Sequence, residues 1–255
     1  MPQLSVVIIT FNEEKNIARC LDSVQGIADD IVVVDSFSSD QTAAICNKYG
    51  VHFIQCQWMG YSATKNFANE VAKYDWVLSL DADEALSEEL KASILKIKQG
   101  DQLLTCEFNR LTNYCGSWIK HGGWYPDKKI RIFDRTNTKW GGIIHEELLF
   151  EKPVSVVHLN GDCLHYSYYT REQHYKQAEN FTTIAAKDLY EKGKKASVVK
   201  LLISPVVKFI RDYFMKLGIL DGAAGFTVSR ISAYATYLKY KKLRTLNATN
   251  GASVN

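Results

Sequence analysis

The sequence lacks the glycine-rich loops with which many nucleotide-binding proteins hold phosphate groups. No G-x-G-x-x-G motif follows the first apolar segment, and no G-x-x-x-x-G-K-[ST] motif occurs in the 255 residues. The chain is therefore neither a typical dinucleotide-binding enzyme nor a P-loop nucleotidase. A nucleoside diphosphate bound by such a chain would have to be neutralised by a metal ion and by side chains.

Spacings typical of disulfide or zinc sites are also missing. None of the six cysteines forms a C-x-x-C pair, and several lie in apolar patterns as core thiols. The H-E-x-x-H motif fails because Leu149 stands where a second His is needed after His145 and Glu146. We expect no disulfides, and we interpret isolated histidines such as His165 as packing or surface residues.

The chain shows neither a secretory signal nor a membrane-spanning run. Its first apolar run has no charged region before it and soon meets polar residues at 12–14. Residues 198–220 are apolar but contain four cations, Asp212 and Pro205, which make a spanning helix unfavourable. We expect a cytoplasmic protein.

Positive charge is concentrated near the C-terminus. Residues 187–245 contain ten Lys and three Arg against four acidic residues, a net charge of +9, whereas the whole chain carries +3. Apolar and basic residues alternate within this segment, which favours interfacial helices on an anionic membrane surface. Alternatively, these helices pack on the rest of the chain or form a homodimer contact. A nucleic-acid partner is not expected, because no binding module accompanies the basic segment.

Four apolar, strand-like runs alternate with helical patterns in the first third of the chain. The runs are residues 4–10, 31–35, 51–54 and 76–81. The order β-α-β-α-β-α-β predicts an α/β fold with a doubly wound, mostly parallel sheet. In such a sheet, ligands bind beyond the carboxyl ends of the strands.

Acidic and polar residues follow these predicted strands directly. Asp81 and Asp83 end the run WVLSLDADE, and two carboxylates in this position suit Mg²⁺ or Mn²⁺. The alternative is that they cap the next helix. The ends of three strands together predict a nucleotide pocket, whose polar residues are Thr10, Asn12, Glu13, Asp35, Asp81 and Asp83.

Four segments in this order resemble the inverting, nucleotide-sugar-dependent glycosyltransferases of family 2, which have the GT-A fold. They are LSVVIITFNEE, IVVVDSFSSDQT, ATKNFANEVAKYDWVLSLDADE and GGWYPDKKIRIF. Within the family, the GGWYPD segment and the basic C-terminal extension resemble the glucosyltransferases that act on heptose in the lipopolysaccharide core.

The resemblance implies roles for residues of the donor site. Thr10, Asn12 and Glu13 would line the uridine pocket, and Asp35 would accept a hydrogen bond from uracil. The pair formed by Lys65 and Asn66 would face the diphosphate, at a place where the family more often has Arg. Asp81 would face the ribose and the metal, and Asp83 would bind the metal directly. Without the resemblance, Asp35 is equally well a helix cap and Lys65 a solvated surface charge.

The general base and the acceptor site are less firmly indicated. Family members commonly use a Glu-Asp pair, which is missing here. We choose Glu146 as the base, with Asp127 as the reserve. Trp124 and Tyr125 lie in a loop rich in Gly and Pro and are assigned to acceptor binding with His145, although they would also suit an interior aromatic cluster.

These observations lead to one hypothesis and three alternatives. We expect a metal-dependent transfer of glucose from UDP-glucose to a heptose of the lipopolysaccharide core, at the inner face of the cytoplasmic membrane. A polyprenyl phosphate or another glycolipid is the alternative acceptor. A phosphatase of the haloacid-dehalogenase type is disfavoured because Ala85 replaces the expected Thr or Val, and a silent scaffold protein remains a further alternative.

We expect three regions along the chain. Residues 1–165 would form the GT-A catalytic domain, and residues 166–246 a basic helical extension on the membrane surface. Residues 247–255 are small and polar and would form a disordered tail.

Overall fold

A computed structural model describes residues 2–142 and 146–251. The chain forms two compact units. The sheet unit comprises Met1–Arg110 and Asp127–Tyr166, and the helical unit comprises Leu111–Pro126 and Ser167–Asn255. The expected boundary near residue 165 is therefore close, but the expectation that residues 1–165 form one domain is wrong for residues 111–126.

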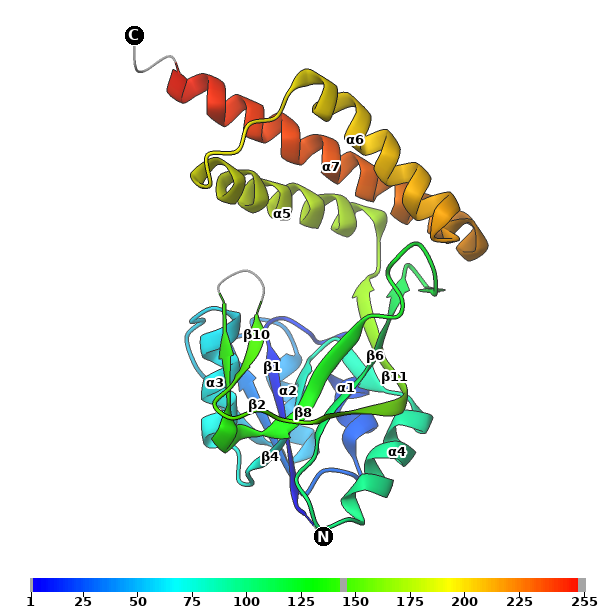
Figure 1. The fold of residues 1–255 in the computed structure, drawn as a ribbon. Coiled ribbons are helices and arrows are strands. Elements are labelled where there is room, and N and C mark those ends of the chain that lie inside the picture. Colours follow the sequence, from blue (N-terminus) through cyan, green and yellow to red (C-terminus); the bar gives the residue numbers. More distant parts are fainter. Residues whose placement is uncertain (1, 143–145, 252–255) are drawn as a thin grey trace. The chain divides into compact units, whose positions relative to one another are not determined.

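The first half of the sheet unit has the predicted parallel arrangement. Strands β1 and β2 pair in parallel, β4 pairs with the other edge of β1, and β3 pairs with β2 (Figure 1). Helices connect successive strands, as the alternating pattern requires. The elements are β1 (Leu4–Thr10), α1 (Ile17–Val24), β2 (Asp30–Asp35), α2 (Thr42–Tyr49), β3 (His52–Gln55), α3 (Tyr61–Val71) and β4 (Trp76–Asp81).

The sheet continues beyond β4 with antiparallel strands, so the sheet as a whole is mixed. Its order is β3-β2-β1-β4-β8-β6-β11-β5. Strands β6 and β11 run on into the helical unit. The elements of this half are β5 (Glu84–Leu86), α4 (Glu88–Lys98), β6 (Thr105–Tyr114), β8 (Lys128–Asp134), η1 (Arg135–Asn137), β9 (Thr138–Gly141), β10 (Glu147–Phe150) and β11 (Val156–Tyr168), with β9 and β10 forming a separate two-stranded sheet.

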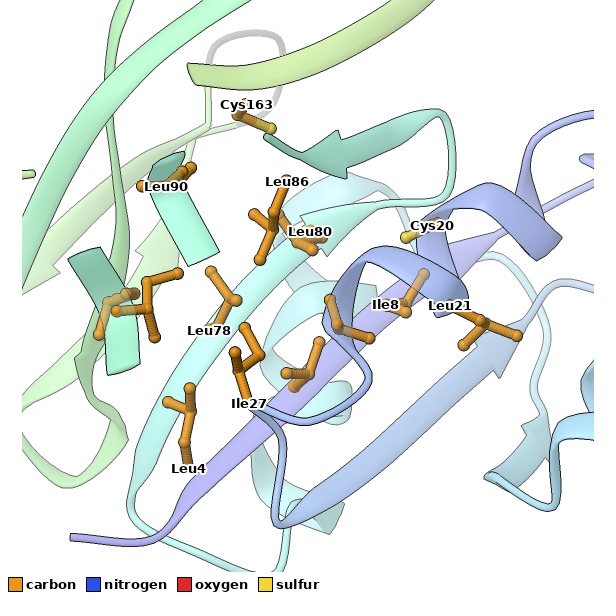
Figure 2. Close-up of a cluster of buried hydrophobic side chains, with 14 of the residues drawn as sticks. Leu4, Ile8, Cys20, Leu21, Ile27, Leu78, Leu80, Leu86, Leu90 and Cys163 are labelled. Atoms are coloured by element: carbon orange, nitrogen blue, oxygen red, sulfur yellow. The ribbon is translucent and has the colours of Figure 1, made fainter. Parts of the chain in front are cut away.

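Core residues cover both faces of the parallel strands. Strand β1 is therefore fully buried. Leu4 and Ile8 face a cluster that includes Cys20 and Leu21 of α1 (Figure 2). Val7 belongs to a second cluster, with residues of α3 and β9. The long apolar runs without alternation are explained by this burial on two faces.

The helical unit is built from two long helices and one shorter helix. A capping box at Thr170 and Gln173 starts α5, and Tyr114, Trp124, Tyr168 and His174 form an aromatic cluster that holds residues 111–126 in this unit. The elements are β7 (Ser117–Ile119), α5 (Arg171–Glu191), α6 (Val198–Ile210), η2 (Arg211–Met215), η3 (Gly218–Asp221) and α7 (Gly222–Gly251).

The expectation of a disordered tail can be compared with the structure only as far as residue 251. Residues 247–251 continue helix α7, so the expectation is wrong for them, and residues 252–255 lie outside the described part of the chain. Small polar residues can extend a helix that is already nucleated. No helix among the described residues is both long and apolar enough to cross a bilayer.

Candidate active site

The carboxyl ends of three parallel strands bring the predicted donor-site residues together. Thr10 is the register partner of Asp35, and Ile9 is the partner of Asp81. These pairings place the ends of β2, β1 and β4 side by side at one sheet edge. The nucleotide-pocket residues that end these strands are therefore neighbours in the structure.

Asp35 is held in one orientation at this edge. Its Oδ2 accepts hydrogen bonds from the backbone N–H of Ser38 at 2.9 Å and from Nε2 of Gln55 at 3.1 Å, and the Ser38 hydroxyl donates to Oδ1. Helix α2 begins at Thr42, with Gln41 as its N-cap. Asp35 is therefore not a helix cap, and the alternative reading of this residue is wrong.

Two hydroxyls next to Asp35 have no hydrogen-bond partner among the described residues. Thr10 Oγ1 and Ser36 Oγ are both buried and unpaired. Buried polar groups normally have a partner, so unpaired groups at a strand end are available to a ligand. The sequence pointed to Thr10 but gave no role to Ser36.

The loop after β1 is fixed by side-chain contacts. Asn12 has a φ of 55°, and its Oδ1 accepts a hydrogen bond from the backbone of Ser39 at 2.8 Å. Glu13 Oε2 accepts one from Nδ2 of Asn16 at 2.7 Å. Burial disfavours the charged carboxylate and raises the pKa of Glu13 to about 7.

Asp81 is neutralised by two cations. Its Oδ1 lies 3.0 Å from Nζ of Lys65, and its Oδ2 lies 3.0 Å from Nη2 of Arg131. Burial raises the pKa of the carboxyl group, but these two cations outweigh burial and hold it well below its usual range. Asp81 therefore stays ionised, and both its oxygens face protein cations.

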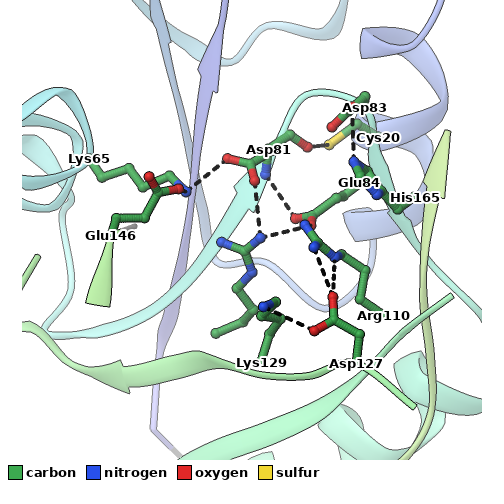
Figure 3. A network of polar contacts seen from close by, with 11 residues as sticks. Cys20, Lys65, Asp81, Asp83, Glu84, Arg110, Asp127, Lys129, Glu146 and His165 are labelled. Carbon is green, nitrogen blue, oxygen red and sulfur yellow. Dashed lines mark hydrogen bonds and ion pairs between the residues drawn. The ribbon is translucent and has the colours of Figure 1, made fainter. Parts of the chain in front are cut away.

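Lys65 links Asp81 to the predicted base. Its side chain is 1% exposed, and its Nζ lies 3.0 Å from Oε1 of Glu146 as well as from Asp81 (Figure 3). The alternative reading of Lys65 as a solvated surface charge is therefore wrong. Asn66 instead bonds the backbone of Trp140, with its Nδ2 donating at 2.9 Å and its Oδ1 accepting at 2.8 Å.

A buried ion-pair network continues from Asp81 into the antiparallel half of the sheet. Arg131 Nη2 lies 2.7 Å from Oε1 of Glu84, whose side chain is fully buried. Arg110 lies 3.6 Å from the same Glu84 oxygen and binds Asp127 through Nε at 2.9 Å and Nη2 at 2.8 Å. No motif in the sequence pointed to Glu84, Arg110 or Arg131, although a cation inside the apolar run KIRIF was a usable signal.

The reserve base, Asp127, has both oxygens in ion pairs. Besides Arg110, it contacts Nζ of Lys129 at 3.0 Å. Accepting a proton from a substrate would require it to give up these contacts. Glu146 has an ion pair at one oxygen among the described residues, Oε1 with Lys65, so it would give up less than Asp127, and the catalytic role of either residue stays a prediction.

Asp83 faces a histidine instead of a cationic side chain of Lys or Arg. Its Oδ2 lies 3.2 Å from Nε2 of His165 on β11 (Figure 3). Burial lowers the pKa of His165, but Asp83 more than offsets this, so that the pKa lies above its ordinary value. The interpretation of His165 as a packing or surface residue is incomplete, because its ring lies against the predicted metal ligand.

The helix-cap alternative for Asp81 and Asp83 is also wrong. Helix α4 is capped by Ser87, whose hydroxyl accepts a hydrogen bond from the backbone N–H of Leu90 at 3.2 Å. The two acidic residues precede this cap and contact Lys65, Arg131 and His165 instead.

The residues described fit a divalent cation only in part. No group of three metal-binding side chains is found among residues 2–142 and 146–251. Asp83 and His165 nevertheless present an oxygen and a nitrogen within 3.2 Å of each other, close enough to bind one ion together. An ion held by two protein ligands needs further ligands from a phosphate or water, as is common for Mg²⁺ and Mn²⁺ sites.

The predicted acceptor residues lie in the helical unit or outside the described residues. Trp124 is half-buried, with its ring 5.6 Å from that of His174 and 5.9 Å from that of Tyr168. This packing agrees with the interior aromatic alternative for Trp124. Tyr125 is also half-buried, and His145 lies outside the described residues. Acceptor binding by these residues stays a prediction.

Comparison with known proteins decides the family. The profile of the family described as "Glycosyl transferase family 2" matches residues 5–156, which include the strand ends, Glu146 and the ion-pair network. The chain belongs to glycosyltransferase family 2. The resemblance of the four sequence segments is confirmed, and so is the GT-A fold class.

Relatives of this glycosyltransferase span nearly its whole length. An uncharacterized glycosyltransferase of Rickettsia typhi is 34% identical over 97% of this chain and 88% of its own. The lipopolysaccharide core biosynthesis glycosyltransferase LpsC of Rhizobium meliloti is 27% identical over 94% of this chain and 91% of its own.

Solved structures of other proteins show a more distant likeness to this glycosyltransferase. Staphylococcus aureus TarS matches with a TM-score of 0.45 and 16% identity, over 97% of this chain and 55% of that one. Glucosyl-3-phosphoglycerate synthase of Mycobacterium tuberculosis matches with a TM-score of 0.36 and 19% identity, over 44% of each chain.

Proposed function

We propose that this family 2 enzyme is an inverting, metal-dependent glycosyltransferase that uses UDP-glucose. The observation that carries the proposal is the pair formed by Asp83 and His165, 3.2 Å apart, next to the carboxyl ends of three parallel strands. A metal-binding pair beside strand ends that carry unpaired hydroxyls suits a nucleoside diphosphate whose phosphates bind the same ion.

The nucleoside would bind at the ends of β1 and β2. The unpaired hydroxyls of Thr10 and Ser36 are available to it, and Asp35 would accept a hydrogen bond from the base. Asn12 shapes the loop and Glu13 lies in it, and both are proposed to line the uridine pocket. Asn66 is proposed to act through Trp140, whose backbone it binds, rather than on the diphosphate itself.

The metal would be held by Asp83 and His165. Asp81 would act indirectly, because its oxygens face Lys65 and Arg131. An imidazole ligand suits Mn²⁺ better than Mg²⁺, which prefers oxygen ligands, so we propose Mn²⁺. When bound, the ion would supply charge neutralisation for the departing diphosphate.

The transfer would need one proton acceptor and one stabilised leaving group. Glu146 would take the proton from the acceptor hydroxyl, whose oxygen then forms a bond to the anomeric carbon of glucose. The bond from that carbon to the diphosphate breaks in the same step, and UDP leaves with the electron pair. The Glu146 carboxylate would become neutral on taking this proton, and its ion pair with Nζ of Lys65, 3.0 Å away, would be given up in the step.

The acceptor is proposed from relatives rather than from the site. LpsC acts in lipopolysaccharide core biosynthesis, as its name states, and supports a heptose of the lipopolysaccharide inner core as the acceptor of this enzyme. The alternative acceptors are a polyprenyl phosphate and another glycolipid. Such acceptors are lipid-linked, so we propose that the enzyme works at the inner face of the cytoplasmic membrane.

Calorimetric titration with uridine nucleotides tests this proposal. UDP-glucose, UDP-galactose and UDP-N-acetylglucosamine are titrated into the protein with Mn²⁺ and again with a chelator. Binding that needs Mn²⁺ and is tightest for UDP-glucose supports the donor assignment. Absence of binding by any uridine nucleotide contradicts the proposal and favours the phosphatase or scaffold alternatives.

A further inference from the structure

Helix α6 exposes its apolar side chains instead of burying them. Residues spaced three or four apart along the helix and into η2 are each about half exposed or more, and none of the residues of α6 is buried. This spacing places them on one continuous face. We call this face the α6 ridge, and its residues are Val199, Leu202, Ile203, Val206, Val207, Ile210 and Phe214.

Other side chains of α6 already have their partners within the helical unit. Phe209 packs edge-on against Phe226 of α7, with ring centroids 5.8 Å apart, and Nζ of Lys200 lies 5.1 Å from the ring of Tyr240. The α6 ridge is therefore not the face that α6 uses to pack on α7. A second apolar face on a helix that is already packed indicates an external partner.

The exposed apolar surface extends beyond the end of α6. Met215 is 75% exposed and Leu220 is 64% exposed, and Leu217 and Ile219 between them are also about half exposed. These residues lie in the turn formed by η2 and η3. The surface is thus longer than one helix face, and scattered surface residues do not account for it.

Cations accompany this surface, and the nearby acidic residues are already paired. Lys194 and Lys195 precede α6 and are exposed. Asp212 is buried and contacts Nζ of Lys208 at 2.6 Å and Nε of Arg211 at 3.0 Å. Asp221 is paired with His121, whose Nδ1 lies 2.8 Å from its Oδ1. The net charge around the ridge is therefore positive.

We propose that the α6 ridge, continued by Met215, Leu217, Ile219 and Leu220, is the surface by which this protein inserts into the interface of an anionic phospholipid bilayer. Exposed apolar residues would enter the headgroup region, and the flanking lysines would face the lipid phosphates. This inference rests on the proposed function to the extent that a lipid-linked acceptor brings the enzyme to a membrane.

A second copy of this chain is a poorer occupant for the ridge. A symmetric contact through α6 would bring the same basic surface of both copies together, so that the positive charge around one ridge would face the positive charge around the other. Such like charges repel each other, whereas an anionic bilayer neutralises all of them. Charge thus favours the bilayer over the dimer.

The ridge is connected to the loop that carries Trp124 and Tyr125 within the same unit. The backbone N–H of Gly122 donates to the carbonyl of Lys216 at 2.8 Å, and the backbone N–H of His121 donates to Oδ2 of Asp221 at 2.8 Å. Insertion of the turn at η2 and η3 would therefore hold this loop close to the membrane surface, where a lipid-linked acceptor is found.

Flotation of the full-length protein with lipid vesicles tests the inference. We expect the protein to float with vesicles of phosphatidylglycerol and phosphatidylethanolamine, less well at high salt, and poorly with neutral phosphatidylcholine. The double substitution Leu202→Asp and Val206→Asp should lower the bound fraction more than about tenfold, because it places two charges in the apolar contact.

Matched control variants distinguish a loss of binding caused by the ridge substitutions from a general effect of added charge. Phe181→Asp with Ile184→Asp places the same charges on exposed apolar positions of α5 and should leave flotation unchanged. Lys194→Glu with Lys195→Glu alters only exposed side chains and should weaken binding to anionic vesicles alone. Thermal unfolding followed by circular dichroism confirms that each variant is folded.

Flotation and calorimetry test the proposed membrane surface and the proposed donor site separately. Failure of the wild-type protein to float, equal flotation of the ridge variant, or a dimer in ultracentrifugation that the ridge variant abolishes would overturn the inference. Calorimetric binding of UDP with Mn²⁺ needs no vesicles. A protein that binds UDP but does not float would refute only the membrane surface, whereas one that floats without binding UDP would refute only the donor site.

Discussion

Nε2 of His165 lies 3.2 Å from Oδ2 of Asp83, although the two residues are far apart in the chain. The antiparallel pairing of β11 with β5 creates this contact by placing His165 opposite Glu84. The pair supplies an oxygen and a nitrogen ligand where the proposed donor diphosphate would bind. It also makes metal binding depend on the protonation of one imidazole.

Metal affinity should rise with pH. The pKa of His165 lies above its ordinary value, and below that pKa the ring is protonated and cannot bind an ion. As the pH rises through this pKa, the imidazole ring loses its proton, and the affinity of the protein for Mn²⁺ should increase to a plateau. Electron paramagnetic resonance of free Mn²⁺ in the presence of UDP measures this dependence.

The variant His165→Asn should bind Mn²⁺ at least about tenfold more weakly and lose most of the pH dependence. His158→Asn is the matched control, because His158 also lies 3.2 Å from a carboxylate, that of Glu107, away from the predicted metal ligand. An unchanged Mn²⁺ affinity in His165→Asn would show that His165 is not a ligand.

Replacing the proposed base should slow transfer without preventing donor binding. Glu146→Gln keeps the size of the side chain but cannot accept the acceptor proton, so we expect turnover to fall by about 10²–10⁴-fold. The affinity for UDP-glucose should stay within a few-fold of the wild type. Turnover and calorimetric affinity are measured on the same preparation.

Glu147→Gln is the control for the base, because Glu147 is the neighbouring residue and is exposed. It should have nearly normal turnover. If Glu146→Gln also has nearly normal turnover, the base is reassigned to Asp127, and Asp127→Asn is then expected to show the loss.

Removing Arg131 should destabilise the sheet unit strongly. Arg131→Met leaves the fully buried Glu84 carboxylate without its 2.7 Å partner and removes one of the two cations at Asp81. We expect the free energy of unfolding to fall by about 3–5 kcal/mol, as measured by denaturant titration.

A second substitution shows whether uncompensated charge is the cause. Adding Glu84→Gln to Arg131→Met should recover part of the lost stability, and failure to do so would contradict the electrostatic explanation. Lys128→Met on the same strand is the control. Its ion pair with Glu107 is largely exposed on the Lys side, so the loss should be about 1 kcal/mol or less.

The raised pKa of Glu13 should appear in the pH dependence of stability. The folded protein holds this proton up to about pH 7, whereas the unfolded chain releases it near 4.5. The contribution of Glu13 to stability should therefore decrease as the pH rises from 4.5 to 7 and stay constant above 7. The decrease is at most about 3 kcal/mol.

Comparison of the wild type with Glu13→Gln by denaturant titration from pH 4.5 to 8 isolates this effect. The stability of the wild type relative to the variant should decline over that range. Glu14→Gln, a substitution at the exposed neighbouring residue, is measured over the same range for comparison. A wild-type curve that also runs parallel to Glu13→Gln would contradict the raised pKa.

The sequence was sufficient to predict the parallel half of the sheet and the meeting of its strand ends. Runs such as residues 4–10 and 76–81 are apolar without alternation, which is typical of strands buried on both faces. Because parallel strands end at one edge, the acidic residues after β2 and β4 had to lie near each other. The family resemblance added roles to these residues.

The partners of those residues depended on tertiary structure. His165, Arg131 and Arg110 come from antiparallel strands whose register no local pattern reveals, since a shift by one residue turns every side chain to the other face. Only the pairings of β8 with β4, of β6 with β8 and of β11 with β5 bring them to Asp81, Asp83 and Glu84.

The sequence by itself determined that this chain has an α/β sheet with acidic strand ends and a basic, apolar C-terminal segment, because composition and periodicity are local properties. Tertiary structure alone decided which cation meets which carboxylate and that the apolar stripe of α6 faces outward. Both depend on contacts between distant segments. A helical pattern shows that a stripe exists, but only the packed structure shows whether the protein itself covers it.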